Sequence, residues 1–166
     1  MPRHLFLTGQ KRVGKSTLLH TLLADAGGPV SGFYTVRSVE IFQGRPSVHM
    51  LCAATGMEPS EDNLLFLCGT HDPHAAERFD RLGTAALAVP GRLIVMDELG
   101  PHEARADVFC RRVMELLDGD VPVLGVLQQS DSPFLQAVAR HPRVEVVEVT
   151  EENRDALADT LRDRWS

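Results

Sequence analysis

The sequence predicts an α/β domain built on a mainly parallel sheet with helices on its faces. Strand-like and helix-like segments alternate from residue 92 onward, as they do in proteins built from βαβ units. Two of these segments, 92–100 and 121–129, are almost continuously apolar, which is typical of parallel strands buried on both faces. No linker divides the chain, so we expect a single domain over residues 1–166.

The elements of the first half follow from local patterns. Residues 4–8 are a short apolar run, and residues 15–25 carry leucines at helical spacing until glycines and a proline follow. Two segments rich in β-branched and aromatic residues then flank a glycine turn, which predicts an antiparallel hairpin near residues 30–53. A polar loop over 57–63 leads into a further apolar segment, 64–68.

The second half alternates helices with strands. In chain order, we expect a helix from 74 until Pro90 ends it, a strand over 92–100, a helix over 103–118, a strand over 121–129, a helix over 133–140, a strand over 143–150 and a helix over 151–165.

Composition limits the partners and the location. Seventeen Lys and Arg against 23 Asp and Glu give a net charge of -6. This argues against nucleic acid or an anionic membrane as the main partner, because both favour a broad basic face. No apolar run is long enough to span a bilayer or to form a signal peptide. Cys52, Cys68 and Cys110 are far apart, which favours core thiols in a reducing compartment. We expect a cytoplasmic protein, and no protein partner is indicated.

The segment GQKRVGKS, Gly9 to Ser16, matches the pattern G-x-x-x-x-G-K-[ST] at every fixed position. It stands between a predicted strand and a predicted helix, which is the context the pattern requires. Glycines let successive backbone N–H groups point at phosphate oxygens, and the helix N-terminus adds partial positive charge there. The predicted phosphate cradle, a P-loop, consists of Gly9, Gln10, Lys11, Arg12, Val13, Gly14, Lys15, Ser16 and Thr17.

The residue types within this P-loop indicate separate roles. Lys15 is expected to reach the β- and γ-phosphates of a nucleotide, and the Ser16 hydroxyl to hold magnesium. The backbone N–H of Thr17 is expected near the α-phosphate. Lys11 and Arg12 stand at variable positions, where solvent-facing charge is the simpler interpretation. The alternative for the whole motif is a tight strand-to-helix turn that contains a fortuitous lysine.

An acidic pair follows the buried strand in the segment VMDELG. Asp97 is expected to bind magnesium directly or through a bound water. Glu98 is in a place to deprotonate an attacking water as a general base. The alternative is that both acids merely begin a polar loop, but the P-loop favours the catalytic interpretation. Gln128 and Gln129 end the next strand and either sense the γ-phosphate or belong to an ordinary exit loop.

Three polar residues, His71, Asp72 and His74, could ligate a transition metal. Pro73 and the polar surroundings favour an exposed loop instead.

Beyond the P-loop, three further motifs point to a family. They are SGFYT at 31–35, VMDELGPHE at 95–103 and VEVVEVTEENRDAL at 144–157. In this combination the chain resembles the small nucleoside-triphosphatases of the thermophilic-hydrolase and cancer-related NTPase type. The resemblance implies a P-loop NTPase fold of the additional-strand, catalytic-glutamate type with an attached hairpin. It also implies slow, magnesium-dependent release of phosphate from several nucleoside triphosphates, ATP and GTP among them.

The resemblance assigns roles by position. Gly9 to Thr17 would form the phosphate cradle, Asp97 would hold magnesium and Glu98 would be the catalytic acid. Glu103 matches a second family glutamate, whose role could be to hold its loop.

The same resemblance extends to the start of the last predicted helix. Asn153 and Arg154 match an Asn-Arg pair of the family, and Thr150 is expected to cap the helix. Arg154 would form a salt bridge at the helix start or contact the nucleotide.

Three positions depart from the family pattern, and each removes a cation. The arginine expected after Thr35 is displaced to Arg37, a common lysine is Pro101, and a basic residue is replaced near Ser130. Such a cation neutralises charge on the transferring phosphoryl group. The candidates for replacing it are Arg12, Arg37 and Arg111.

Three functions remain open at this stage. The leading one is an NTPase that uses water as the nucleophile. A nucleoside or nucleotide kinase would use the same P-loop, with an arginine-bearing lid in 102–118. The third is a nucleotide-dependent switch activated by a partner, although the chain has no N/T-K-x-D base-reading motif.

Overall fold

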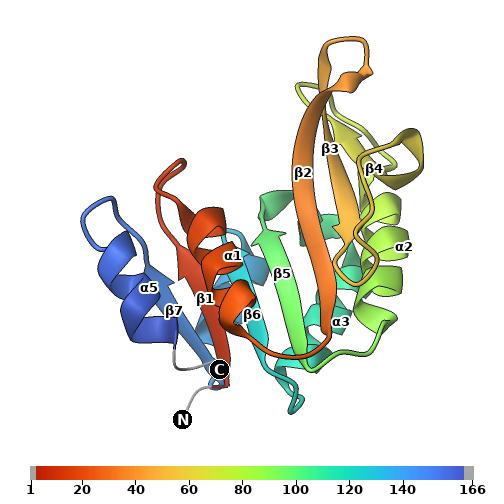
Figure 1. Cartoon of the computed structure of the whole chain (residues 1–166). Helices are drawn as coiled ribbons and strands as arrows, with labels where there is room; N and C mark the ends of the chain where they lie inside the picture. Colours follow the sequence, from red (N-terminus) through yellow and green to blue (C-terminus); the bar gives the residue numbers. More distant parts are fainter. Residues whose placement is uncertain (1–2, 163–166) are drawn as a thin grey trace.

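A seven-stranded sheet runs through residues 3–162, the part of the chain that the computed structural model describes (Figure 1). The strands are β1 (His4–Thr8), β2 (Val30–Phe42), β3 (Arg45–Cys52), β4 (Leu64–Leu67), β5 (Leu93–Leu99), β6 (Val123–Leu127) and β7 (Val144–Glu148). The α-helices are α1 (Lys15–Asp25), α2 (Ala75–Ala88), α3 (Asp107–Leu117), α4 (Pro133–Arg140) and α5 (Arg154–Arg162). Two short 3₁₀ helices are η1 (Glu61–Asn63) and η2 (Pro101–Arg105).

The order of strands across the sheet is β4-β3-β2-β5-β6-β1-β7. Neighbouring strands from β2 to β7 are parallel, whereas β3 and β4 are antiparallel additions at one edge. Strand β6 lies between β1, which leads into the P-loop, and β5, which carries the acidic pair. This inserted strand confirms the predicted additional-strand fold, and the mainly parallel sheet with its hairpin is also confirmed.

Two hydrophobic cores lie on opposite faces of the sheet. Successive residues of a strand point to opposite faces, so Phe6 of β1 enters one core while Leu5 and Leu7 enter the other. Helices α2, α3 and α4 cover the Phe6 face, and α1 and α5 cover the other. Full burial of one such side chain contributes roughly 1.5–3 kcal/mol. The sheet is therefore a rigid base for the loops at its upper edge.

The β2–β3 hairpin extends beyond the rest of the sheet (Figure 1). Only Val30 to Tyr34 of β2 pair with β5, and the remainder of β2 pairs with β3 alone. Gly32 allows the two strands to approach, because a Cβ atom there would lie 1.9 Å from the carbonyl oxygen of Val95. The glycine of the SGFYT motif is thus a packing requirement, and it fixes the position of β2 against β5.

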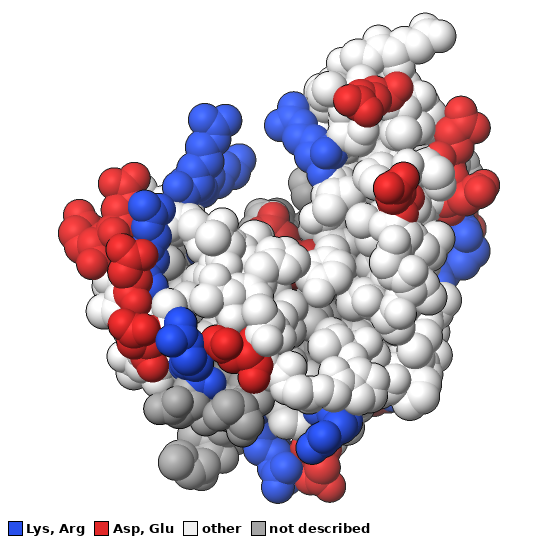
Figure 2. Space-filling view, viewed as in Figure 1, with Lys and Arg blue, Asp and Glu red and all other residues white. Residues whose placement is uncertain are grey.

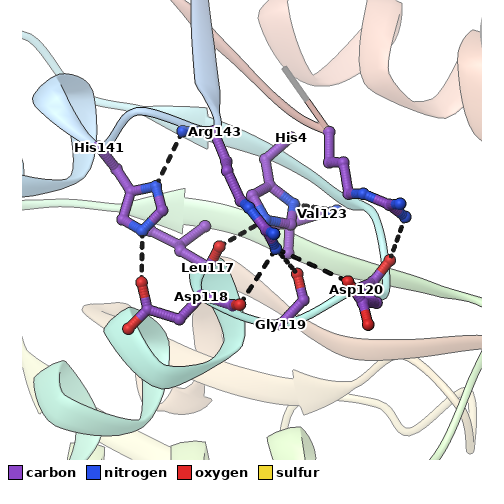
Figure 3. A network of polar contacts seen from close by, with 9 residues as sticks. His4, Leu117, Asp118, Gly119, Asp120, Val123, His141 and Arg143 are labelled. Atoms are coloured by element: carbon purple, nitrogen blue, oxygen red, sulfur yellow. Dashed lines mark hydrogen bonds and ion pairs between the residues drawn. The ribbon is translucent and has the colours of Figure 1, made fainter. Parts of the chain in front are cut away.

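Two buried histidines lie at the end of the sheet where β1 and β7 begin (Figure 3). His4 is fully buried; its Nδ1 accepts from the Val123 N–H at 3.0 Å, and its Nε2 lies 2.8 Å from the Leu117 carbonyl. These partners require a neutral ring with the proton on Nε2, and burial lowers the pKa of His4 accordingly. His141 binds the Asp118 carboxylate through Nε2 at 2.7 Å. The two rings thus join β1, and the segment that precedes β7, to the chain between α3 and β6.

The helix expected over 103–118 is interrupted at Ala106. Residues Pro101–Arg105 form η2, and α3 begins only at Asp107. The side chain of Glu103 turns back to accept the N–H of Gly100, which stabilises a tight turn instead of a continuous helix. The expectation of one helix here was wrong because the contact between Glu103 and Gly100 stabilises a 3₁₀ turn in place of the first turn of an α-helix.

The last helix begins three residues later than expected. The Asn153 N–H donates to Thr150 Oγ1 at 3.2 Å, and the Thr150 N–H donates to Asn153 Oδ1 at 2.7 Å. This exchange closes a turn before α5 and confirms the capping role expected of Thr150. The expected residues 163–165 of this helix lie outside the described residues.

Two further expectations can be compared with the structure. The three cysteines are unpaired, but each is only partly buried and none is a fully buried core thiol. Within residues 3–162, no helix has the length and apolar character that crossing a bilayer would demand.

Candidate active site

The P-loop leaves β1 and runs directly into the first turn of α1. Gly9 has a φ of 144°, and a Cβ atom there would lie 2.5 Å from the carbonyl oxygen of Val149, so glycine is required. Val13 is buried in the core with α1 and anchors the loop from below. The side chains of Gln10, Lys11, Arg12, Ser16 and Thr17 are exposed. The loop is therefore held at two points and remains open to a ligand.

Lys15 spans the inside of this loop. Its Nζ donates to the carbonyl oxygen of Gly9 at 2.8 Å, and its side chain is partly buried. The ammonium group thus lies across the mouth of the curl, where the backbone N–H groups and the start of α1 also concentrate positive potential. An anion bound there would meet the ammonium group directly.

Asp97 of β5 faces the start of α1 across the inserted strand β6. Ser16 Oγ donates to Asp97 Oδ1 at 3.2 Å, and Asp97 is only 6% exposed. Burial, with a smaller contribution from the neighbouring charge of Glu98, raises the pKa of Asp97 to about 6. Within residues 3–162 no cation forms an ion pair with Asp97, and the attraction of Lys15 and His20 is weaker than the effect of burial. Together, the hydroxyl and carboxylate oxygens fit a divalent cation, which prefers such oxygen ligands.

Removing the Asp97 charge is expected to stabilise the metal-free protein. The folded-state pKa lies above the ordinary value of 3.8. The folded state therefore binds the proton more tightly than the unfolded state, and stability falls as pH rises from about 4 to about 6. In Asp97→Asn, the free energy of unfolding in chelator at pH 8 should rise by roughly 1–3 kcal/mol. Thermal unfolding followed by circular dichroism measures this difference.

The pH series contains its own test. At pH 4 the gain from Asp97→Asn should vanish, because Asp97 is then protonated in the folded state. Asp131→Asn, at an exposed position, is the control and should show no gain at either pH. A destabilised Asp97→Asn at pH 8 would contradict the interpretation of Asp97 as an uncompensated buried charge.

Thr35 of β2 fixes the backbone of the acidic pair. Its hydroxyl donates to the Asp97 carbonyl oxygen at 3.3 Å and accepts the N–H of Glu98 at 3.2 Å. One side chain therefore satisfies both backbone groups at the point where the two carboxylates diverge. Thr35 belongs to the SGFYT motif, but the sequence alone does not indicate this contact.

Glu98 is held by a second long-range contact. Gln128 Nε2, at the end of β6, donates to Glu98 Oε1 at 2.6 Å. Both side chains line a cavity of about 150 Å³ that also touches the P-loop, here named the phosphate cavity. Its lining residues are Gly9, Gln10, Lys11, Lys15, Glu98, Gln128 and Gln129. The structure thus brings the lysine of the P-loop and the carboxylate of Glu98 to one space.

Glu103 lies behind this site, in η2. It is 4% exposed, and its carboxylate accepts the N–H of Gly100. Burial, as the largest cause, raises the pKa of Glu103 to about 8. This contact between Glu103 and Gly100 holds the loop after β5, which is the role that the resemblance implied for Glu103.

A model of a family described as NTPase matches residues 4–161 of the chain. The chain belongs to this NTPase family. Membership confirms the prediction of an enzyme that hydrolyses nucleoside triphosphates, and it confirms the resemblance inferred from the motifs.

Individual relatives span nearly the whole chain. The nucleoside-triphosphatase THEP1 of Methanosarcina barkeri is 32% identical over 96% of this chain and 95% of its own. The cancer-related nucleoside-triphosphatase of Homo sapiens is 29% identical over 95% of this chain and 93% of its own. The crystal structure of THEP1 from the hyperthermophile Aquifex aeolicus superimposes with a TM-score of 0.72 at 19% identity, covering 98% of this chain and 99% of that one. This likeness supports the fold.

One of the three arginines that could neutralise charge on the transferring phosphoryl group lines the same cavity as Glu98. Arg37 of β2 lines a cavity together with Lys11, Glu98 and Gln128. Figure 2 shows Lys and Arg side chains on both sides of a hollow above the sheet, with acidic side chains within it. All three arginines are exposed, but Arg12 and Arg111 do not line either cavity that Glu98 borders. The structure therefore ranks Arg37 first.

Arg154 has a role that the sequence did not indicate. Its Nη1 donates to the carbonyl oxygen of Val13 at 3.3 Å, and its side chain packs against Gly14. Within residues 3–162, Arg154 makes no ion pair, so the expected salt bridge is absent. The guanidinium group braces the P-loop from the start of α5.

The polar side chains of the loop around residue 72 contact one another and the start of α2. Asp72 pairs with Arg78 and accepts the N–H of His74, and His74 contacts Glu77. No group of three or more potential metal ligands occurs in the described part of the chain. The interpretation of His71 and His74 as exposed loop residues agrees with their exposure.

Proposed function

We propose that this member of the NTPase family hydrolyses the γ-phosphate of ATP, GTP and other nucleoside triphosphates, giving a nucleoside diphosphate and phosphate. The observation that carries the proposal is the phosphate cavity, in which Lys15 and Glu98 line the same space. An ammonium group and a carboxylate at one phosphate-sized cavity supply both charge stabilisation and a base.

The reaction follows from these side chains. The P-loop N–H groups and Lys15 bind the β- and γ-phosphates, with Lys15 exchanging the Gly9 carbonyl for phosphate oxygens. Glu98 accepts a proton from the water that attacks the γ-phosphorus, and Gln128 holds the Glu98 carboxylate in position. Arg37 and Lys11 neutralise charge on the transferring phosphoryl group.

Magnesium is the metal that we propose for the site. Ser16 and Asp97 would hold it, because one hydroxyl and one carboxylate oxygen suit a hard cation that keeps several waters. When bound, magnesium neutralises charge on the β- and γ-phosphate oxygens.

The nucleoside is expected to lie on the other side of the P-loop. A cavity of about 360 Å³ opens there between α1 and α5, lined by Gly14, Thr17, Thr21, Arg154 and Asp155 among others. None of the described residues that line it is aromatic, so none of them provides a stacking contact that would favour one base. A cavity lining without a base-specific stacking contact supports use of several nucleoside triphosphates.

A substrate panel tests the proposal. Purified protein is incubated with ATP, GTP, CTP and UTP, with magnesium or with chelator, and released phosphate is measured. We expect release from each triphosphate with magnesium and almost none in chelator. Release from a single triphosphate would contradict the proposed range, and undiminished release in chelator would remove magnesium from the proposal.

Arg37→Ala is expected to reduce turnover roughly 10- to 100-fold, because a charge-assisted contact to the transferring group is lost. The KM for ATP should change much less, since the P-loop is intact. Steady-state phosphate release gives both constants. Arg45→Ala, an exposed arginine of the same hairpin, is the matched control and should behave like the unmodified protein. Equal effects of the two substitutions would assign the loss to the hairpin rather than to Arg37.

A further inference from the structure

Two more cavities adjoin the phosphate cavity on the side away from the P-loop helix. The inner cavity, of about 350 Å³, shares Lys11, Glu98 and Gln128 with the phosphate cavity. The outer cavity, of about 510 Å³, shares Phe66 and His102 with the inner one. The three cavities thus lie next to one another in a row, from the P-loop past Glu98 to residues of β4 and η2.

The size of this space exceeds what hydrolysis needs. An attacking water occupies about 30 Å³, whereas small-molecule sites commonly measure about 300–1,000 Å³. The inner and outer cavities each reach this range. Because Glu98 lines both the phosphate cavity and the inner cavity, its carboxylate borders the two spaces that a donor and a second ligand would occupy.

The walls of the two cavities suit a planar ring. The rings of Phe66 and His102 lie with centroids 4.6 Å apart at the junction of the cavities, and His102 is exposed. The two rings are tilted by 31° and contact each other, so the exposed ring of His102 is the one on which a further flat ring can stack; we call this pair the Phe66–His102 platform. Leu65 and Phe79, both buried, form the apolar floor of the inner cavity.

The outer cavity offers hydrogen-bond donors to such a ring. Arg105 and His71 line it, and within residues 3–162 no ion pair or hydrogen bond engages either side chain. The acid of this cavity, Asp72, is already paired with Arg78, which holds its pKa below the ordinary value. The Arg105 guanidinium therefore offers donors, and the His71 imidazole offers a donor or an acceptor; both suit the carbonyl, amino and ring-nitrogen groups of a nucleobase.

We propose that the inner and outer cavities bind a nucleoside as a second substrate, which accepts the γ-phosphoryl group in place of water. The inference rests on the function proposed for the phosphate cavity. The base stacks on the Phe66–His102 platform, and the sugar hydroxyl enters the inner cavity beside Glu98. The hydroxyl oxygen forms a bond to the γ-phosphorus while the bond from that phosphorus to the β,γ-bridging oxygen breaks. The hydroxyl proton passes to Glu98, and the products are a nucleoside diphosphate and a nucleoside monophosphate.

The test follows the fate of the γ-phosphate. ATP labelled at the γ-phosphate is incubated with magnesium, the protein and each of the common ribonucleosides and deoxyribonucleosides in turn at millimolar concentration. Labelled nucleoside monophosphate and labelled inorganic phosphate are then separated and counted. We expect at least one nucleoside to become labelled. In His102→Ala, the ratio of transfer to hydrolysis should fall roughly three- to tenfold, the magnitude of a lost stacking contact. In His74→Ala, an exposed histidine outside both cavities, the ratio should not change.

The outcomes separate the two proposals. Label found in inorganic phosphate alone, with every nucleoside, overturns the acceptor site and leaves the hydrolase proposal standing. Equal transfer ratios in His102→Ala and His74→Ala also overturn it, because the platform would then make no contact. A third outcome is labelled nucleoside monophosphate when a nucleoside is present, together with no phosphate release when nucleoside is left out. That result would support the acceptor site and overturn hydrolysis as the main activity.

Discussion

Lys15→Ala is expected to weaken triphosphate binding and to abolish measurable turnover. The substitution removes the ammonium group that lies 2.8 Å from the Gly9 carbonyl, and the other lysine that lines the phosphate cavity, Lys11, is exposed and makes no such contact in the described structure. Loss of one charge-assisted contact weakens binding by about 1.5–3 kcal/mol, roughly 10- to 150-fold in Kd. Loss of charge stabilisation in the transition state lowers the rate by a further factor on the order of 10²–10³. Titration calorimetry and phosphate release measure the two effects.

The control for this prediction is a basic residue far from the site. Arg81→Ala, on the exposed face of α2, removes the same charge from the chain and should leave both measurements unchanged. Near-normal turnover in Lys15→Ala would exclude the P-loop from the mechanism.

Glu98→Gln is expected to separate binding from chemistry. The amide keeps the size of the side chain but cannot accept the proton of the attacking water, so turnover should fall by roughly 10²–10⁴-fold. Affinity for a nonhydrolysable triphosphate should stay within about threefold, because Glu98 lies beyond the P-loop donors that bind the β- and γ-phosphates. Single-turnover kinetics and calorimetry measure the two quantities.

A surface substitution of the same kind serves as the reference. Glu61→Gln changes an exposed glutamate of η1 and should have no effect on either quantity. A loss of only a few fold in Glu98→Gln would assign the base to another group. A parallel loss of affinity would mean that Glu98 contributes to nucleotide binding as well.

The parts of the site that could be predicted are encoded by neighbouring residues. The P-loop is an eight-residue pattern between a strand and a helix, and Asp97 and Glu98 directly follow an apolar run. Periodicity gave most elements within a few residues. It missed the break at Ala106 because the Glu103 carboxylate turns back onto Gly100, a side-chain choice that an apolar repeat does not record.

The parts that could not be predicted are contacts between distant segments. Gln128 had two interpretations, and only the position of β6 beside β5 brings its amide to Glu98. Arg154 reaches the carbonyl of Val13 across 141 residues of sequence. The Thr35 contacts with the acidic pair depend on β2 packing against β5 through Gly32. Local pattern cannot supply such geometry, because it depends on how the strands are ordered.

The Thr35 hydroxyl bonds the hairpin strand β2 to the backbone of both acids, which belong to β5. The bond from Ser16 to Asp97 links the same acids to the start of α1 on the other side of β6. The acidic pair is therefore positioned from two sides, by the hairpin and by the P-loop helix. The hairpin is thus part of the scaffold of the active site, although it contributes neither the P-loop nor the two acids.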